Sequence, residues 1–168
     1  HNRKELLEVF WKYPGVFELL PIEDDDTKRP FWHQNFWKSL DAKANLKHMP
    51  DPKGNAQSLK DFKTFRDNIR TFLNDELDND DFRNIYYICG QSDQTVFDYT
   101  FKDRFLSAKD KLVYKATSYG DGSVTWKTGI PKQLLNTPNL YYTHTSHGDL
   151  ANEAYIFHGI SDILETGS

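Results

Sequence analysis

The sequence has few of the features that mark several classes of protein. Cysteine occurs once in 168 residues, at Cys89, so the chain can form neither an internal disulfide nor a zinc site built on cysteines. No run approaches the ~18 apolar residues of a membrane-spanning helix, and the N-terminus lacks the residue order of a signal peptide. We therefore expect no transmembrane segment and no disulfide framework.

An excess of charge of either sign is also missing. Lys and Arg number 21 against 25 Asp and Glu, giving a net charge of −4, and the basic residues are interspersed with acidic ones. Without a basic stripe to contact phosphates, we expect no nucleic-acid partner. The chain does contain 38% hydrophobic and 15% aromatic residues, which is enough to build one sizeable core.

Residues 1–81 have helical periodicity. Asn2 and Glu5 form a capping pair that predicts a first helix, ended by Pro14-Gly15. A second helix is predicted over residues 31–40, with Pro30 in its first turn. Polar stretches at residues 22–29 and 47–57 are predicted loops.

A third, longer helix is predicted to begin at the capping-box pair Ser58 and Asp61 and to continue to about Leu77. Its apolar residues recur on one face, as expected of a helix that packs on a core. This stripe comprises Leu59, Phe62, Phe65, Ile69, Phe72 and Leu73.

From residue 82 onward strands alternate with helices. Residues 84–89 form a short apolar run, typical of a strand covered on both faces in a parallel sheet. Residues 95–101 and 111–117 alternate in polarity and are predicted to pair as a hairpin through residues 107–110, and residues 139–145 predict the next strand. This order indicates an α/β fold with a mainly parallel sheet, a β-hairpin and flanking helices.

A last helix is predicted over residues 150–164. Asp149 is its expected N-cap, and Gly167 lies just beyond its end. The residues expected to face the core are Leu150, Ala154, Phe157, Ile160 and Leu164.

Two polar motifs follow predicted strands. Asp121 lies between Gly120 and Gly122, after the strand at residues 111–117, and His147 follows the strand at residues 139–145. Taken singly, the first is a common turn and the second a loop histidine. Together they match the acid and base of a hydrolytic triad, because a histidine base needs a carboxylate to fix its tautomer. Both follow successive predicted strands, which should end at the same edge of the sheet. We therefore expect an Asp121 carboxylate oxygen ~2.6 to 3.2 Å from His147 Nδ1.

A nucleophile is harder to assign. Ser92, in Gly90-Gln91-Ser92-Asp93-Gln94, half matches a nucleophile elbow, but Gln94 replaces the small fifth residue and a β-like run follows where the elbow needs a helix. Its alternative interpretation is a loop residue at a strand end. Cys89 lies within a predicted strand, as expected of a buried free thiol.

Several motifs together resemble a known family. They are Gly-Asp-Gly-Ser-Val-Thr-Trp at residues 120–126, Gly129-Ile130-Pro131, Ser-His-Gly-Asp-Leu at 146–150 and Leu-Glu-Thr-Gly at 164–167. These resemble the C-terminal third of α/β-hydrolases related to the lecithin:cholesterol acyltransferase group, and especially hydrolase domains beside caspase-like modules in bacterial multidomain proteins. The segment at residues 13–21 resembles the opening of that group's lid, whereas residues 22–81 match poorly.

The resemblance implies roles for individual residues. It makes Asp121 the triad acid and His147 the base, residues 1–81 a helical lid or cap, and residues 82–168 the C-terminal portion of the hydrolase core. The family's nucleophilic serine lies upstream of the lid. The chain starts at His1 and its one methionine is Met49, so we interpret it as the C-terminal part of a longer protein, inactive without the N-terminal half of the same fold.

Other candidate sites are weaker. The acidic run at residues 23–26 lacks the spaced ligands and glycine turn of a calcium loop, and His33, His48, His144 and His158 have no metal-ligand spacing. We therefore predict no metal and no cofactor. Aromatic residues of the helical segment are expected either to line an acyl-binding lid or to form its own core: Trp11, Phe17, Phe31, Trp32, Phe36 and Trp37.

The sequence thus favours a serine-type hydrolase of ester, thioester or amide bonds, with lipid-like acyl substrates suggested by the lid resemblance. Transfer of the acyl group to an alcohol would use the same residues. The alternative is a non-catalytic, hydrolase-like module that recognises a partner in a larger assembly.

Overall fold

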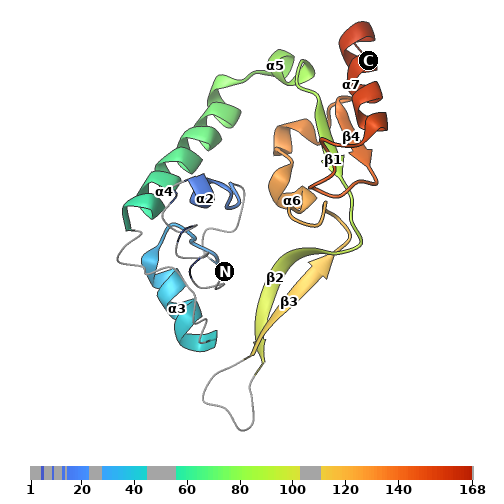
Figure 1. The fold of residues 1–168 in the computed structure, drawn as a ribbon. Coiled ribbons are helices and arrows are strands. Elements are labelled where there is room, and N and C mark those ends of the chain that lie inside the picture. The colour runs from blue at the N-terminus through green and yellow to red at the C-terminus, as the bar shows by residue number, and fades with distance from the viewer. Residues whose placement is uncertain are drawn as a thin grey trace. The chain divides into compact units, whose positions relative to one another are not determined.

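The computed structural model describes Glu5, Val9, Tyr13 and residues 15–22, 28–44, 56–102 and 111–167 (Figure 1). The chain divides into two compact units. One comprises residues 1–74 and 100–113, and the other comprises residues 75–99 and 114–168. Helices and strands are mixed, in agreement with the predicted α/β class.

The described part of the first unit is mainly helical. It contains α2 (Gly15–Glu18), α3 (Gln34–Ala44) and α4 (Ala56–Thr71), and α4 is followed by a π-helical turn, η1 (Phe72–Glu76). Of the predicted first helix, Glu5 and Val9 are helical, whereas Asn2 and Pro14 lie outside the described residues.

Two predicted helix starts are wrong. The second helix begins at Gln34 rather than at residue 31, because Phe31 and Trp32 form a turn in which the His33 N–H donates to Pro30 O. The third begins at Ala56, so Ser58 and Asp61 lie inside α4 and not at its N-cap. Asp61 instead accepts a hydrogen bond from the side chain of Gln57, 2.7 Å away.

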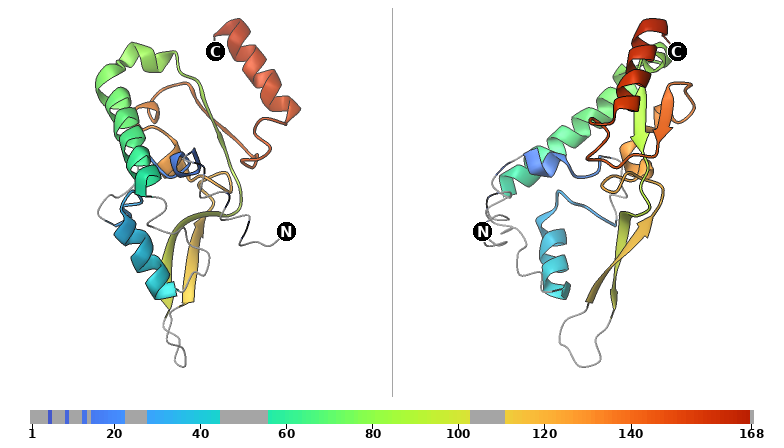
Figure 2. Two further views of the ribbon diagram at one scale, coloured as in Figure 1. Left: turned by 60° about the vertical axis from the view of Figure 1, so that its left-hand side comes forward. Right: turned by 45° about the vertical axis from the view of Figure 1, so that its right-hand side comes forward.

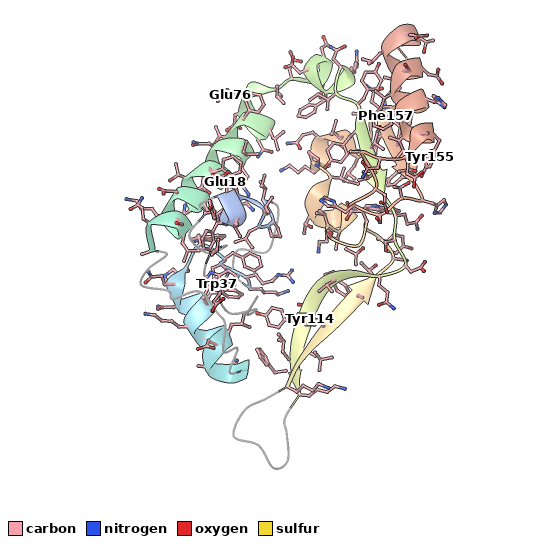
Figure 3. All side chains as sticks on the ribbon, viewed as in Figure 1. Glu18, Trp37, Glu76, Tyr114, Tyr155 and Phe157 are labelled. Atoms are coloured by element: carbon pink, nitrogen blue, oxygen red, sulfur yellow. The ribbon has the colours of Figure 1, made fainter. Side chains whose placement is uncertain are left out.

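The core of this unit is aromatic. Among the residues that the structure describes, its buried hydrophobic side chains are Phe17, Trp37, Leu59 and Phe62. Phe31 and Phe36 pack at ring-centroid distances of 6.0 and 5.4 Å from Trp37, which is labelled on α3 in Figure 3. For the aromatic residues that are described, these contacts favour the core interpretation over a substrate-lining surface. Trp11 lies outside the described residues.

Arg66 occupies a place on α4 that the predicted apolar stripe omitted. Its side chain is buried, and the guanidinium Nε donates to Ile22 O at 2.9 Å. The guanidinium carbon Cζ lies 4.3 Å from the centre of the Trp32 ring. The hydrogen bond and the cation–π contact explain how a charged residue can replace an apolar one on the core face.

The second unit contains a parallel pair of strands. β1 (Tyr87–Gly90) pairs with β4 (Leu140–Thr143), so that Gly90 lies opposite Thr143, and the two strands run side by side in Figures 1 and 2. β1 starts later than predicted because a short helix, α5 (Asn79–Arg83), ends in a turn at Asn84, whose main-chain N–H donates to Asp81 O. That helix is capped by Asp78, whose carboxylate accepts two main-chain N–H bonds.

The predicted hairpin strands, β2 (Thr95–Lys102) and β3 (Lys111–Thr117), pair with each other in a separate, antiparallel sheet. The connection predicted at residues 107–110 lies outside the described residues. Each sheet therefore has two strands in the described part of the chain, and the larger, mainly parallel sheet of the prediction is not found there. Two short helical turns, α6 (Trp126–Gly129) and η2 (Lys132–Leu134), link β3 to β4.

The last helix, α7 (Ala154–Thr166), differs from its prediction in start and orientation. Glu153, not Asp149, is at the N-cap position, and residues 147–152 form turns. Ile156 is the buried residue of α7, whereas Phe157 is 52% exposed and Leu164 is 80% exposed. Figure 3 labels Phe157 with Tyr155, which is equally exposed, on this helix.

Gly167 follows the last residue of α7, as predicted, although the helix continues to Thr166 and not to Leu164. Gly167 has a left-handed φ of 73°, and its N–H donates to Ile163 O at 2.8 Å. Glycine adopts this conformation without steric cost, which is why it often follows the last turn of a helix.

Candidate active site

The loop after β3 folds around the carboxylate of Asp121. Oδ1 accepts hydrogen bonds from the main-chain N–H groups of Ser123 and Val124 at 2.9 and 2.7 Å, and the Asp121 N–H donates to Val124 O at 3.1 Å. Gly122 makes this tight turn possible with a φ of 97°. Asp121 therefore fixes its own loop with one oxygen, and the second oxygen is left to face outward from the turn.

His147 lies in the turn that follows β4. The N–H groups of Asp149 and Leu150 donate to Ser146 O at 3.0 and 3.1 Å, and the Ser146 hydroxyl donates to Asp149 Oδ2 at 2.6 Å. Asp149, predicted as a helix cap, thus stabilises the turn that carries His147.

The two loops meet at two hydrogen bonds. Asp121 Oδ2 lies 2.8 Å from His147 Nδ1, and the His147 main-chain N–H donates to Asp121 O, also at 2.8 Å. The predicted distance is confirmed, but the predicted reason for it is wrong. β3 does not neighbour β4 in one sheet; the loop after β3 is instead held at the end of β1, where the Ser92 N–H donates to Gly120 O.

Burial and hydrogen bonding act in opposite directions on Asp121. Burial of the side chain raises the pKa of its carboxyl, but the hydrogen bonds from Val124, His147 and Ser123 outweigh that effect and lower the pKa below its ordinary value. Asp121 is therefore an anion at neutral pH. The side chain of Asp121 is 11% exposed and that of His147 is 55% exposed, so the carboxylate is sheltered while part of the imidazole faces solvent.

Close packing at Gly90 brings the strand end and both loops together. A β-carbon added to Gly90 would lie 2.3 Å from Thr145 O and 2.8 Å from the β-carbon of Asp121. The indole N–H of Trp126 donates to Gly90 O at 2.8 Å. Only a glycine allows these backbones to approach so closely.

Ser92 and Cys89 lie near the pair without joining it. The part of the chain that is described contains no hydrogen bond between the Ser92 hydroxyl and His147; a β-carbon on Gly122 would lie 3.4 Å from Ser92 Oγ. Ser92 is followed by strand β2 and not by the helix that a nucleophile elbow requires. Cys89 is buried, and burial, with the charge of Asp121, raises the pKa of its thiol to about 11.

Sequence reasoning missed Thr95 and Gly90 as parts of this site. Thr95 Oγ1 accepts a hydrogen bond from the Gly122 N–H at 2.8 Å, although its β-branched side chain and its alternating neighbours indicated only a strand. Gly90 was read as part of a possible elbow. A glycine directly after an apolar strand was the one available signal of close backbone approach.

Among the described residues, no three His, Cys, Asp or Glu side chains lie together as metal ligands would. None of their helices has the length and apolar character needed to cross a bilayer.

No protein-family model, curated protein or solved structure matches this chain. The resemblance to α/β-hydrolases accordingly rests on the sequence motifs alone.

Proposed function

We propose that Asp121 and His147 are the acid and base of a serine-type α/β-hydrolase that cleaves ester, thioester or lipid-like acyl bonds, and that the nucleophilic serine comes from a segment upstream of this chain. The observation that carries the proposal is the 2.8 Å contact between Asp121 Oδ2 and His147 Nδ1. It is supported by the sheltered carboxylate with its lowered pKa and by the partly exposed imidazole.

The proposed chemistry follows from the two nitrogens of the imidazole. Nδ1 carries a proton that it donates to Asp121, so the lone pair of Nε2 is available to accept a proton. Nε2 has no hydrogen-bond partner among the described residues. It would take the proton from the serine hydroxyl as that oxygen attacks the acyl carbon, and then return it to the leaving group. The Asp121 anion stabilises the imidazolium that exists between these steps.

The test uses the intact protein, with its upstream segment, and a chromogenic acyl ester. Asp121→Asn should lower turnover by about 10⁴-fold, by analogy with the same change in a serine protease, because an amide supports the wrong tautomer. His147→Gln should abolish the rate above background. Matched controls are Asp98→Asn, which breaks an exposed ion pair with Lys115, and His144→Gln on an exposed histidine. Wild-type turnover in both site variants would refute the proposal.

A non-catalytic interaction module is the second candidate. The exposed apolar side chains of α7 favour it, since Tyr155, Phe157 and Leu164 present apolar surface to solvent. The intact protein would then hydrolyse no acyl ester, and a fluorophosphonate would label none of its serines. Labelling of one upstream serine, lost in His147→Gln, would instead support the enzyme.

A further inference from the structure

Thr95 is a buried residue in direct contact with the Asp121 loop. It is the first residue of β2, its exposure is 0%, and it lies outside the loop that it touches. Its Oγ1 accepts the hydrogen bond from Gly122, and both Oγ1 and Cγ2 lie 2.8 Å from where a β-carbon on Gly120 would be. Thr95 therefore contacts the glycines on both sides of Asp121.

The Thr95 hydroxyl completes the hydrogen bonding of the turn. Three consecutive main-chain N–H groups follow Asp121. Those of Ser123 and Val124 donate to Asp121 Oδ1, and that of Gly122 donates to Thr95 Oγ1. The first two bonds tie the turn to itself, whereas the third ties it to β2. The direction in which Asp121 Oδ2 points depends on both connections, the one within the turn and the one to β2.

We propose that Thr95 is a positioning residue, which holds the Asp121 turn so that Oδ2 faces His147 Nδ1. Its effect on turnover rests on the function proposed above, but its effect on the aspartate–histidine contact does not. Valine has nearly the shape of threonine and no acceptor, so Thr95→Val should leave the Gly122 N–H without its partner and let the turn relax. Serine keeps the hydroxyl, so Thr95→Ser should retain the contact.

The first experiment measures the tautomer of His147 in this chain by the ¹⁵N NMR shifts of its ring nitrogens, in mildly alkaline solution. The signal is assigned with His147→Gln. In the wild type the contact with Asp121 should hold the Nδ1–H form, and Asp121→Asn should change the shifts by removing that contact. Thr95→Val should move the shifts toward those of Asp121→Asn, whereas Thr95→Ser should leave them near the wild-type values.

The matched control is Thr125→Val. Thr125 is also buried in this loop, but its hydroxyl bonds to Thr128 and not to Gly122, so the ring shifts should stay unchanged.

A wild-type measurement makes the test independent of whether Thr95→Val folds. The Gly122 amide should exchange with solvent deuterium more slowly than an unstructured glycine, because its N–H is bonded.

The second experiment measures ester turnover of the intact protein. Displacement of a catalytic group by about 1 Å lowers rates by about 10²-fold, so Thr95→Val should lose activity on that scale and Thr95→Ser should recover most of it.

Wild-type ring shifts in Thr95→Val, measured beside altered shifts in Asp121→Asn, would overturn the positioning role and leave the hydrolase proposal standing. Ring shifts that respond to Thr95→Val in a protein without turnover would reject the hydrolase alone. An unprotected Gly122 amide would remove the hydrogen bond on which the inference stands.

Discussion

Gly90→Ala should destabilise the second unit and separate the two loops of the candidate site. The new methyl group would lie 2.3 Å from Thr145 O and 2.8 Å from the β-carbon of Asp121. Both neighbours are held by the main chain, so neither can rotate away as a long side chain would. Restoring ordinary contact distances requires a backbone shift of about 1 Å in a closely packed region.

The size of the effect follows from these contacts. Overpacking a core by one methyl group costs about 1 to 3 kcal/mol, and a backbone neighbour places Gly90→Ala at the upper end of that range. The shift also moves Thr145, which precedes the turn that carries His147. We therefore expect a loss of about 3 kcal/mol in the free energy of unfolding, together with weakening of the Asp121 to His147 contact.

The assay is urea unfolding followed by far-UV circular dichroism, with Gly159→Ala as the matched control. Gly159 lies within α7, and a β-carbon there would have no atom within 4 Å. Because alanine is a better helix former, this control should gain about 0.5 to 1 kcal/mol. A Gly90→Ala protein within about 0.5 kcal/mol of wild type, the usual range of surface substitutions, would show that the close approach at the end of β1 has been misjudged.

Three further predictions concern single groups. The pKa of Asp121 is lowered on folding, so its negative charge stabilises the fold above the ordinary carboxyl pKa of about 3.9, and this stability is lost as the pH falls below that value. In an acid titration, the free energies of unfolding of wild type and Asp121→Asn should therefore converge. A constant difference between them down to about pH 2 would contradict this. Cys89 should react with a disulfide reagent at pH about 8 only after unfolding, because its thiol is buried and the pKa of that thiol is raised to about 11. Rapid stoichiometric reaction of the native chain would count against this. A fluorophosphonate should leave this chain unlabelled, since the hydroxyl of Ser92 does not bond to His147, and labelling at Ser92 would make that serine the nucleophile.

The site was predictable from sequence because each of its two residues is set by local rules. An aspartate between two glycines forms a turn whose side chain binds its own loop, and a histidine directly after a strand lies at the end of that strand. What brings them together was not predictable. It depends on the close approach at Gly90 and on the acceptor at Thr95, and both contacts join segments that are distant in the sequence.

The fold shows the same division between local and distant effects. The period-2 alternation of polar and apolar residues located β2 and β3 well, because it depends on consecutive residues alone. The buried face of α7 was misjudged, since the turn at residues 147–152 delays the helix and changes which residues face inward. Arg66 was missed for another reason: its burial depends on Trp32 and on the carbonyl of Ile22, which no helical pattern can reveal.

The two hydrogen bonds between Asp121 and His147 have different structural effects. The bond between the main chains holds the loops together and requires no particular side chain at either position, whereas the bond between the side chains orients the ring. A descendant of this chain could therefore lose the side chain of Asp121 or of His147 and still keep the two loops docked. The contact between the loops does not depend on the contact between the side chains, so the loops could keep their arrangement while the site changed its role.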